Sequence, residues 1–73
     1  MVKIWAIEPK SIAEKAKIKA GDILVSVNEN EINDVLDYRF YITEKKLDLV
    51  ILRGQETLSI TVKKPQYDDL GLE

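Results

Sequence analysis

Two serines, Ser11 and Ser26, are considered as nucleophiles in this chain of 73 residues. A serine hydroxyl needs an adjacent base to take its proton, and histidine is the base that most often does so. The chain contains no histidine, and its lysines give no sign of burial. It also has no cysteine, which excludes a thiolate metal site. We therefore expect a protein that is not an enzyme and that has no cofactor.

Acidic side chains gather near the end of the chain, at Asp68, Asp69 and Glu73. They lack the alternating spacing and the glycine of a calcium-binding loop, so we expect a solvated acidic end without a metal. The formal net charge of -2 arises from 11 basic and 13 acidic residues, with no basic stripe for nucleic acid or for an anionic membrane. Neither a secretory signal nor an apolar run of membrane-spanning length is present, which predicts a cytoplasmic location.

The segment YDDLGLE, residues 67–73, is unusual for the end of a domain. A disordered tail is polar throughout, yet here Leu70 and Leu72 flank Gly71 directly after two aspartates. We therefore expect this segment to have a use in the folded protein.

Strands and helices that position these residues can be predicted from local patterns. Residues 2–7 are rich in β-branched and aromatic side chains, which predicts a strand. Ser11 and Glu14 have the spacing of a capping box, in which each side chain bonds a backbone N–H of the first turn, so a short helix begins there. Two further strands are predicted on either side of a turn at 28–30, at 23–27 and at 31–32.

A longer helix is predicted after residue 33, because the apolar positions take helical spacing and Asn33 or Asp34 can cap its start. Residues 47–62 then predict a hairpin with a turn at 53–56, since apolar residues alternate along both arms. The sequence thus predicts one α+β domain over residues 1–73, a small, partly open antiparallel β-barrel or sandwich with two helices.

The stretch SIAEKAKIKAGDILVSVNENEI resembles the central signature of PDZ domains, and the following helix and hairpin fit the same family. Ile12 stands where bacterial members often have proline, and Lys17 stands where glycine usually ends the first helix. Lys17 must therefore adopt left-handed backbone angles with some strain, or the helix must end differently. The order of elements resembles the circularly permuted PDZ domains of bacteria. The matching residues are Ser11, Ala13, Ala16, Gly21, Asp22, Ile23, Leu24, Val27 and Asn28.

The resemblance implies a loop that holds the end of a bound peptide. In the family, an apolar–glycine–apolar loop exposes backbone N–H groups to the terminal carboxylate of the ligand, and Leu70, Gly71 and Leu72 match that loop. Alternatively, these three residues begin a final strand that completes the sheet without a ligand. Asp68 and Asp69 lie just before them, where negative charge repels a carboxylate.

The resemblance also places the second helix along the other wall of the peptide groove. On this helix Leu36, Phe40 and Thr43 follow an i, i+4, i+7 line suited to a groove. Arg39 is expected to meet a ligand carboxylate. Alternatively, Leu36 and Phe40 belong to the core and Arg39 is solvated. Trp5 is also open to two interpretations. It either contacts a binding partner or packs over the core as a cover.

The resemblance finally bears on the extent of the chain. In the family the strand after the carboxylate loop receives the peptide, and here that strand would begin at Leu72 and Glu73, so we expect residues 1–73 to be the N-terminal part of a longer protein. The patterns DVLDYRF and DDLGLE also resemble the N-terminal PDZ-like module of a bacterial family of radical-SAM-type iron–sulfur proteins. The cysteines that hold such a cluster are absent from this chain.

We therefore predict an interaction module that binds an extended or C-terminal peptide by strand addition, between the Leu70–Leu72 segment and the second helix. The ligand is a free peptide or a segment of the same polypeptide. The alternative is a structural or regulatory module that docks on a following enzyme domain, of radical-SAM or protease type, without a free ligand. We expect a monomer, or a weak dimer that forms through an open sheet edge.

Overall fold

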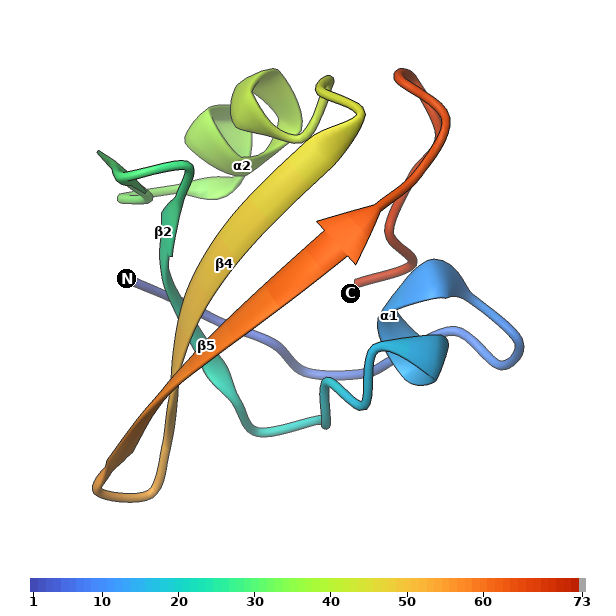
Figure 1. The fold of residues 1–73 in the computed structure, drawn as a ribbon. Helices are drawn as coiled ribbons and strands as arrows, with labels where there is room; N and C mark the ends of the chain where they lie inside the picture. The colour runs from blue at the N-terminus through green and yellow to red at the C-terminus, as the bar shows by residue number, and fades with distance from the viewer. Residues whose placement is uncertain (73) are drawn as a thin grey trace.

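A computed structural model describes residues 1–72 as an antiparallel sheet accompanied by two short helices (Figure 1). The sheet order is β1-β2-β4-β5, and β3 pairs with β2. This arrangement confirms the predicted α+β class. Among these residues no helix is long and apolar enough to cross a membrane. The elements are β1 (Val2–Lys3), α1 (Ile12–Lys15), β2 (Ile23–Val27), β3 (Asn30–Glu31), α2 (Val35–Tyr41), β4 (Lys46–Arg53) and β5 (Glu56–Lys63).

The β4–β5 hairpin forms the longest ladder of the sheet and crosses the molecule in Figure 1. At its end Arg53 lies opposite Glu56, which leaves a two-residue turn. Gly54 begins this turn with φ +63°, a left-handed angle that glycine adopts without steric cost. Alternate residues of β4 are buried, as the alternation in the sequence predicts: Leu47, Leu49 and Ile51.

Helix α1 begins at the predicted capping box. The Ser11 Oγ accepts a hydrogen bond from the Glu14 N–H at 3.2 Å, and the Glu14 Oε1 accepts one from the Lys10 N–H at 3.2 Å. The second bond reaches the residue before the cap, so it fixes the turn that enters the helix. Just after the helix, Lys17 has φ +66°. Lys17 therefore takes the left-handed angles that glycine usually supplies at this point.

An ion pair ties the start of β2 to the end of β4. Asp22 is 2% exposed and accepts hydrogen bonds from the Arg53 Nε at 2.9 Å, the Arg53 Nη2 at 2.8 Å and the Lys19 N–H at 2.9 Å. The Arg53 hydrogen bonds lower the pKa of Asp22, although burial opposes the shift. Arg53 Nη2 also donates to the Lys17 carbonyl at 3.1 Å. The Arg53 side chain therefore holds the start of β2 against the end of β4, and it also fixes the backbone of Lys17.

The core takes side chains from β2, β4, β5, both helices and the C-terminal segment. Lys64 is also buried, at 6% exposure, and its Nζ donates to the Pro65 carbonyl at 3.2 Å and to the Gln66 carbonyl at 2.8 Å. The expectation that no lysine is buried is therefore wrong, because two carbonyls replace water around the ammonium. The buried apolar residues are Ile4, Ala13, Ile18, Leu24, Val27, Ile32, Tyr38, Ile42, Leu47, Leu49, Ile51, Val62 and Leu70.

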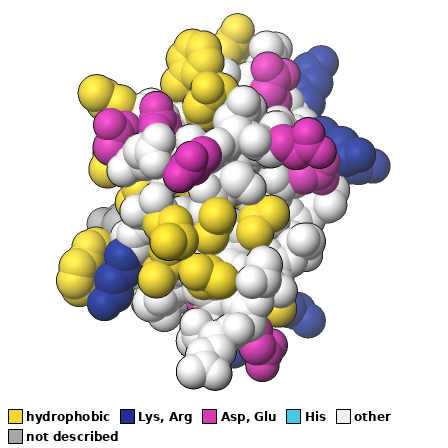
Figure 2. Space-filling view, turned by 90° about the vertical axis from the view of Figure 1, so that its left-hand side faces the viewer, with side chains coloured by type: hydrophobic (Ala, Val, Ile, Leu, Met, Phe, Trp, Pro, Cys, Tyr) yellow, Lys and Arg dark blue, Asp and Glu magenta, His cyan; other side chains and the backbone are white. Residues whose placement is uncertain are grey.

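One face of the molecule carries apolar side chains that the core does not use. Figure 2 views the molecule from the left-hand side of Figure 1 and shows hydrophobic side chains gathered near the middle of that face. Acidic and basic side chains lie around them. Apolar residues of β2 and β4 that remain only half-buried are Ile23, Val25, Val50 and Leu52. An antiparallel sheet can leave one face to solvent in this way.

The N-terminal segment changes its bonding partner along its length. Strand β1 is regular only at Val2–Lys3, where it pairs with β2. Ile4 then bonds through its N–H and carbonyl to two consecutive residues that precede β2, which is the pattern of a bulge. Further on, Ile7 forms an antiparallel bridge with Leu72. The predicted strand over residues 2–7 is interrupted because its two ends bond to different segments.

The C-terminal segment returns across the molecule and reaches α1, as Figure 1 shows in red beside the blue helix. Leu70 is fully buried, and its carbonyl accepts a hydrogen bond from the Ala13 N–H at 2.8 Å. Gly71 and Leu72 follow it along the N-terminal segment. These three residues are thus part of the fold. Glu73, where the sequence predicts that a strand continues, lies outside the described residues.

Candidate functional site

A cleft of about 330 Å³ lies between the N-terminal segment and α2, with a mostly apolar lining. One wall comes from β1 and the two residues after it, and the other comes from one face of α2. A residue of β2 and a residue of the C-terminal segment complete the lining. The lining residues are Val2, Lys3, Ile4, Trp5, Leu24, Val35, Tyr38, Arg39 and Leu72.

The β1 wall is an edge of the sheet. Within residues 1–72, β1 has a strand partner on one side only, which is β2. The Ile4 N–H and carbonyl both bond toward β2, at 2.8 and 2.7 Å. Because backbone groups alternate in direction along an extended strand, those of Lys3 and Trp5 face the opposite, outer side. An outer edge of this kind can accept another strand.

The α2 wall begins at a well-formed helix cap. The Asp34 Oδ1 accepts a hydrogen bond from the Asp37 N–H at 2.9 Å, which fixes the first turn. Val35, Tyr38 and Arg39 are spaced i, i+3 and i+4 and so share one face of the helix. Tyr38 is buried, whereas Val35 is 53% exposed. The helix therefore anchors itself through Tyr38 and leaves an apolar side chain open to the cleft.

The C-terminal segment brings backbone amides to the end of this wall. The Gly71 carbonyl accepts a hydrogen bond from the Glu8 N–H at 2.9 Å, and Gly71 has φ +90°. The Asp69 Oδ1 accepts bonds from the Gly71 N–H and from the Tyr38 hydroxyl, both at 3.4 Å. Burial raises the pKa of Tyr38, and the charge of Asp69 raises it further. The hydroxyl thus stays protonated and can act as a donor.

Four of the seven predicted site residues lie at or beside the cleft. Arg39 and Leu72 line it. Leu70 and Gly71, both buried, directly precede Leu72 and hold it against the N-terminal segment. The structure therefore brings the C-terminal segment and α2 to one cleft, while the role of these residues in binding stays a prediction.

The other three predicted residues do not line this cleft, and their role in binding stays a prediction. Leu36 is 75% exposed and Phe40 is 70% exposed, and neither lines the cleft. The alternative that Leu36 and Phe40 belong to the core is wrong, since both are exposed. Thr43 follows the helix, and its Oγ1 donates to the Phe40 carbonyl at 2.9 Å, so its hydroxyl closes the last turn. The reason is geometric: Tyr38 turns toward the core, and a helix that is only seven residues long presents its other face to solvent.

The sequence did not single out Val35 and Tyr38 as site residues. Their spacing with Ile42 is i, i+3, i+7, and this inner stripe was available in the sequence beside the outer stripe that includes Phe40. Trp5 was given two interpretations, and its exposure of 72% rules out a cover for the core. The Lys3 Nζ lies 4.4 Å from the centre of the Trp5 ring, which holds the ring on the surface of the cleft.

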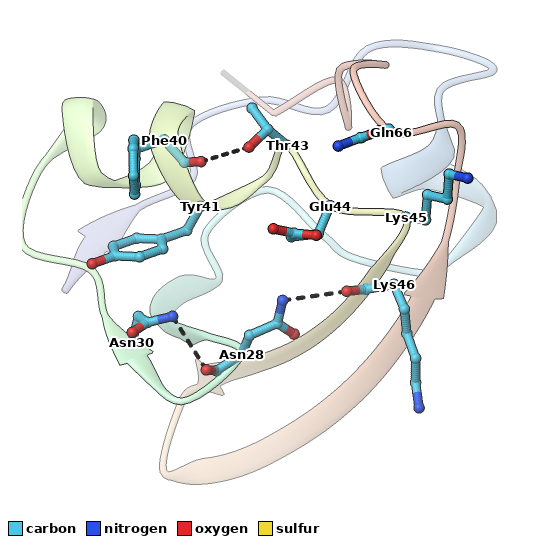
Figure 3. A pocket seen from close by; sticks show the side chains of 9 residues that line it. All are labelled: Asn28, Asn30, Phe40, Tyr41, Thr43, Glu44, Lys45, Lys46 and Gln66. Carbon is cyan, nitrogen blue, oxygen red and sulfur yellow. Dashed lines mark hydrogen bonds between the residues drawn. The ribbon is translucent and has the colours of Figure 1, made fainter.

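A second cavity, of about 650 Å³, lies beyond the C-terminal end of α2 (Figure 3). Two of its carboxamides already have partners: the Asn28 Nδ2 donates to the Lys46 carbonyl at 3.2 Å, and the Asn30 Nδ2 donates to the Asn28 carbonyl at 3.2 Å. The Asn28 Oδ1 also accepts from the Asp48 N–H at 2.8 Å. These bonds brace the turn between β2 and β3, and no edge of β1 reaches this cavity. It is lined by Asn28, Asn30, Phe40, Tyr41, Thr43, Glu44, Lys45, Lys46 and Gln66.

Comparison with known proteins identifies the family. A family model of the PDZ domain matches residues 4–53, which is more than half of the chain. The chain therefore belongs to the PDZ domain family. PDZ domains are non-catalytic interaction modules that bind peptides. The match ends at Arg53 and so does not extend to Leu70, Gly71 and Leu72.

Similar proteins include the mitochondrial serine proteases HTRA2 of Drosophila virilis and of Drosophila erecta. Each is 32% identical over 63 residues, which cover 84% of this chain and 15% of the protease. The chain thus spans about 15% of the length of these relatives. Among solved structures, the crystal structure of the HtrA3 PDZ domain bound to a phage-derived ligand (FGRWV) is similar, with a TM-score of 0.78 and 27% identity, and the match covers 84% of this chain and 56% of that chain.

The comparisons confirm the resemblance to PDZ domains that the central signature indicates. The circular permutation, the bacterial type and the likeness to iron–sulfur proteins stay predictions.

Proposed function

We propose that this PDZ domain binds an extended peptide in the cleft between the N-terminal strand and α2, by strand addition beside the Leu70–Leu72 segment. The observation that carries this proposal is the outer edge of β1, which faces the apolar side of α2 across the cleft. Main-chain hydrogen bonds to that edge supply affinity, and the apolar walls select side chains.

The bridge between Ile7 and Leu72 supports strand addition, because it lies on the same N-terminal segment and is antiparallel. The bridge indicates that this segment can accept an antiparallel partner, and within residues 1–72 the outward-facing backbone groups of Lys3 and Trp5 have no strand paired to them. The similar HtrA3 PDZ domain was solved with the ligand FGRWV, a peptide of matching apolar and aromatic character. These features favour a ligand with at least one large apolar side chain.

The size of the cleft limits the affinity. A cleft of about 330 Å³ holds one or two side chains. One buried apolar side chain contributes roughly 2 kcal/mol, and each ladder hydrogen bond contributes about 1 kcal/mol. After the cost of association, a dissociation constant of about micromolar or weaker follows.

Two exposed aromatic residues provide a matched test. Trp5 lines the cleft and is 72% exposed, whereas Phe40 lies outside it and is 70% exposed. The fluorescence anisotropy of fluorescein-labelled FGRWV, titrated with protein, measures binding. Trp5→Ala is expected to weaken binding about tenfold, because it removes a large apolar contact, and Phe40→Ala is expected to leave it unchanged. The placement of the peptide would be contradicted if both variants lost the same affinity, or if Trp5→Ala bound FGRWV as tightly as the wild type.

A second candidate function follows from the length of the relatives. The matched region is a small part of two serine proteases, which favours a regulatory module that docks on an enzyme domain. In that case the cleft is filled by a segment of the same polypeptide. Deleting residues 1–73 from the full-length protein would then change the activity of that protein, while FGRWV would fail to bind the intact protein.

A further inference from the structure

Strand β5 forms the edge of the sheet opposite β1, and it runs in orange across Figure 1. Just after it, the Lys64 N–H donates to the Lys45 carbonyl at 2.8 Å. Because backbone groups alternate in direction along an extended strand, the even-numbered residues of β5 face β4 and the odd-numbered residues face away from it. Within residues 1–72, the backbone groups of the odd-numbered residues have no partner strand. These residues are Thr57, Ser59, Thr61 and Lys63.

The β5 edge lacks the features that usually protect an exposed strand, which are a proline, a bulge, inward-pointing charges or a short length. Strand β5 has eight residues, pairs with β4 without a shift of register, and contains neither proline nor glycine. Its charges stand only at the ends, at Glu56 and Lys63, and the residues between them, TLSITV, are uncharged and mostly β-branched. Leu58 and Ile60 pack against the core but remain half-buried. This edge can therefore accept another strand.

The strand that fits this edge best is a second copy of β5. In an antiparallel pair with Ile60 opposite Ile60 of the other copy, Leu58 lies opposite Val62, and the outward-facing residues exchange hydrogen bonds with one another. The end with Glu56 then lies beside the end with Lys63, whereas a parallel pair would bring like charges together. A shift of two residues in one direction would place Glu56 opposite Val62, and in the other direction it would place a lysine opposite Leu58. The register with Ile60 on the symmetry axis is therefore favoured.

We propose that two copies of this domain associate through their β5 edges into a symmetric dimer with one continuous sheet. The contact uses the same strand in both copies, so it consumes both β5 edges and ends at two copies. A single strand pair is a small interface, and the dimer is therefore weak. The edge of β1, which borders the cleft, lies at the other end of the strand order, so this proposal is independent of the proposed function.

Sedimentation velocity from about 10 µM to about 1 mM protein measures the association. The weight-average mass is expected to rise toward that of two chains. Ser59→Lys combined with Thr61→Lys is expected to give a monomer throughout, because each lysine then directly faces a lysine of the other copy. Asn33→Lys combined with Leu36→Lys adds the same charge at two exposed positions beside or on α2, and it is expected to dimerise like the wild type. Circular dichroism verifies that both variants fold.

Disulfide trapping tests the register, and the absence of cysteine from the chain makes a single introduced cysteine unique. Ile60→Cys places the two cysteines in directly opposed positions, where Cβ atoms lie about 5 Å apart. Leu58→Cys is the matched control, because Leu58 is also half-buried on the same face of β5. Its two copies would lie about 13 Å apart along the strands. During oxidation with diamide, Ile60→Cys is expected to form the covalent dimer at least about tenfold faster than Leu58→Cys.

Three results would overturn the proposal. A mass that stays at one chain over the whole concentration range would leave the β5 edge to a strand of another protein. A dimer that persists with lysine at both Ser59 and Thr61 would use a different surface, and equal cross-linking through the two cysteines would exclude the paired β5 strands. None of these results bears on peptide binding, which the titration with FGRWV measures at the opposite edge of the sheet.

Discussion

Replacing Gly71 by alanine tests how tightly the C-terminal segment is built into the fold. A Cβ at this position would overlap the Cβ of Ser11, would lie 2.8 Å from the Ser11 Oγ and would lie 3.4 Å from the Glu8 Cβ. The backbone angle of φ +90° adds strain of its own. Ser11 cannot move freely, because it caps α1 through its bond to the Glu14 N–H.

The loss of folding stability in Gly71→Ala can be estimated by comparison with Gly21→Ala. Gly21 has a similar φ of +94°, but a Cβ there has no neighbour within 4 Å. Gly21→Ala therefore carries the backbone strain alone, about 1–2 kcal/mol. Gly71→Ala adds about 1–3 kcal/mol for the overlap, the usual range for overpacking. Small domains have a total stability of roughly 5–15 kcal/mol, so this loss is a large share.

Urea unfolding followed by circular dichroism measures both losses, and a double-mutant cycle identifies the cause. Ser11→Gly removes the side chain that the new Cβ would overlap and costs only a few tenths of a kcal/mol at a helix cap, about 0.3. In that background Gly71→Ala is expected to cost no more than Gly21→Ala. Equal losses for Gly71→Ala and Gly21→Ala in the wild-type background, or no coupling to Ser11, would refute the packing of the segment against α1.

Three further changes test other parts of the fold. Because Arg53 lowers the pKa of Asp22 below 3.8, the ion pair stabilises the fold above about pH 4, and this contribution is lost as the pH falls through the lowered pKa. Urea midpoints from pH 2.5 to 6 should therefore fall more steeply on acidification in the wild type than in Arg53→Met, which keeps only the Lys19 contacts of Asp22. Equal slopes in the two proteins would contradict the ion pair. Lys64→Met is expected to lower the thermal midpoint by about 5 °C, since two carbonyls lose their donor, while Lys63→Met, at an exposed position, should leave it unchanged. Because the pKa of Tyr38 is raised above its ordinary value of 10.0, the unfolded chain ionises first and stability is lost as the pH rises above about 10. Tyr38→Phe should abolish that alkaline loss, and an unchanged loss would exclude Tyr38 as its source.

Local patterns in the sequence predicted the parts of the fold that depend on near neighbours. The capping box at Ser11, the turn at Gly54 and the burial of alternate residues in β4 all follow from interactions within a few positions. Lys17 was recognised as a position of strain because a side chain there replaces the usual glycine.

The face of α2 that lines the cleft depends on contacts that local patterns do not contain. Apolar residues occur on both sides of this seven-residue helix, so two stripes compete. Tyr38 is drawn inward because its ring is buried and its hydroxyl meets Asp69, which is 31 residues away in the sequence. Phe40 is left outside as a consequence. The buried ammonium of Lys64 was missed for a similar reason, because its two partners are backbone carbonyls rather than an acidic residue.

The most direct test is a titration of the ¹⁵N-labelled protein with FGRWV, followed by backbone amide chemical shifts. If the cleft is the binding site, the largest chemical-shift changes fall on residues 2–5, on Val35, Tyr38 and Arg39, and on Leu72. The amides of Asn28 and Lys46, at the second cavity, then show no change. Changes centred on Asn28 and Lys46, or no saturable change at all, would contradict the central claim.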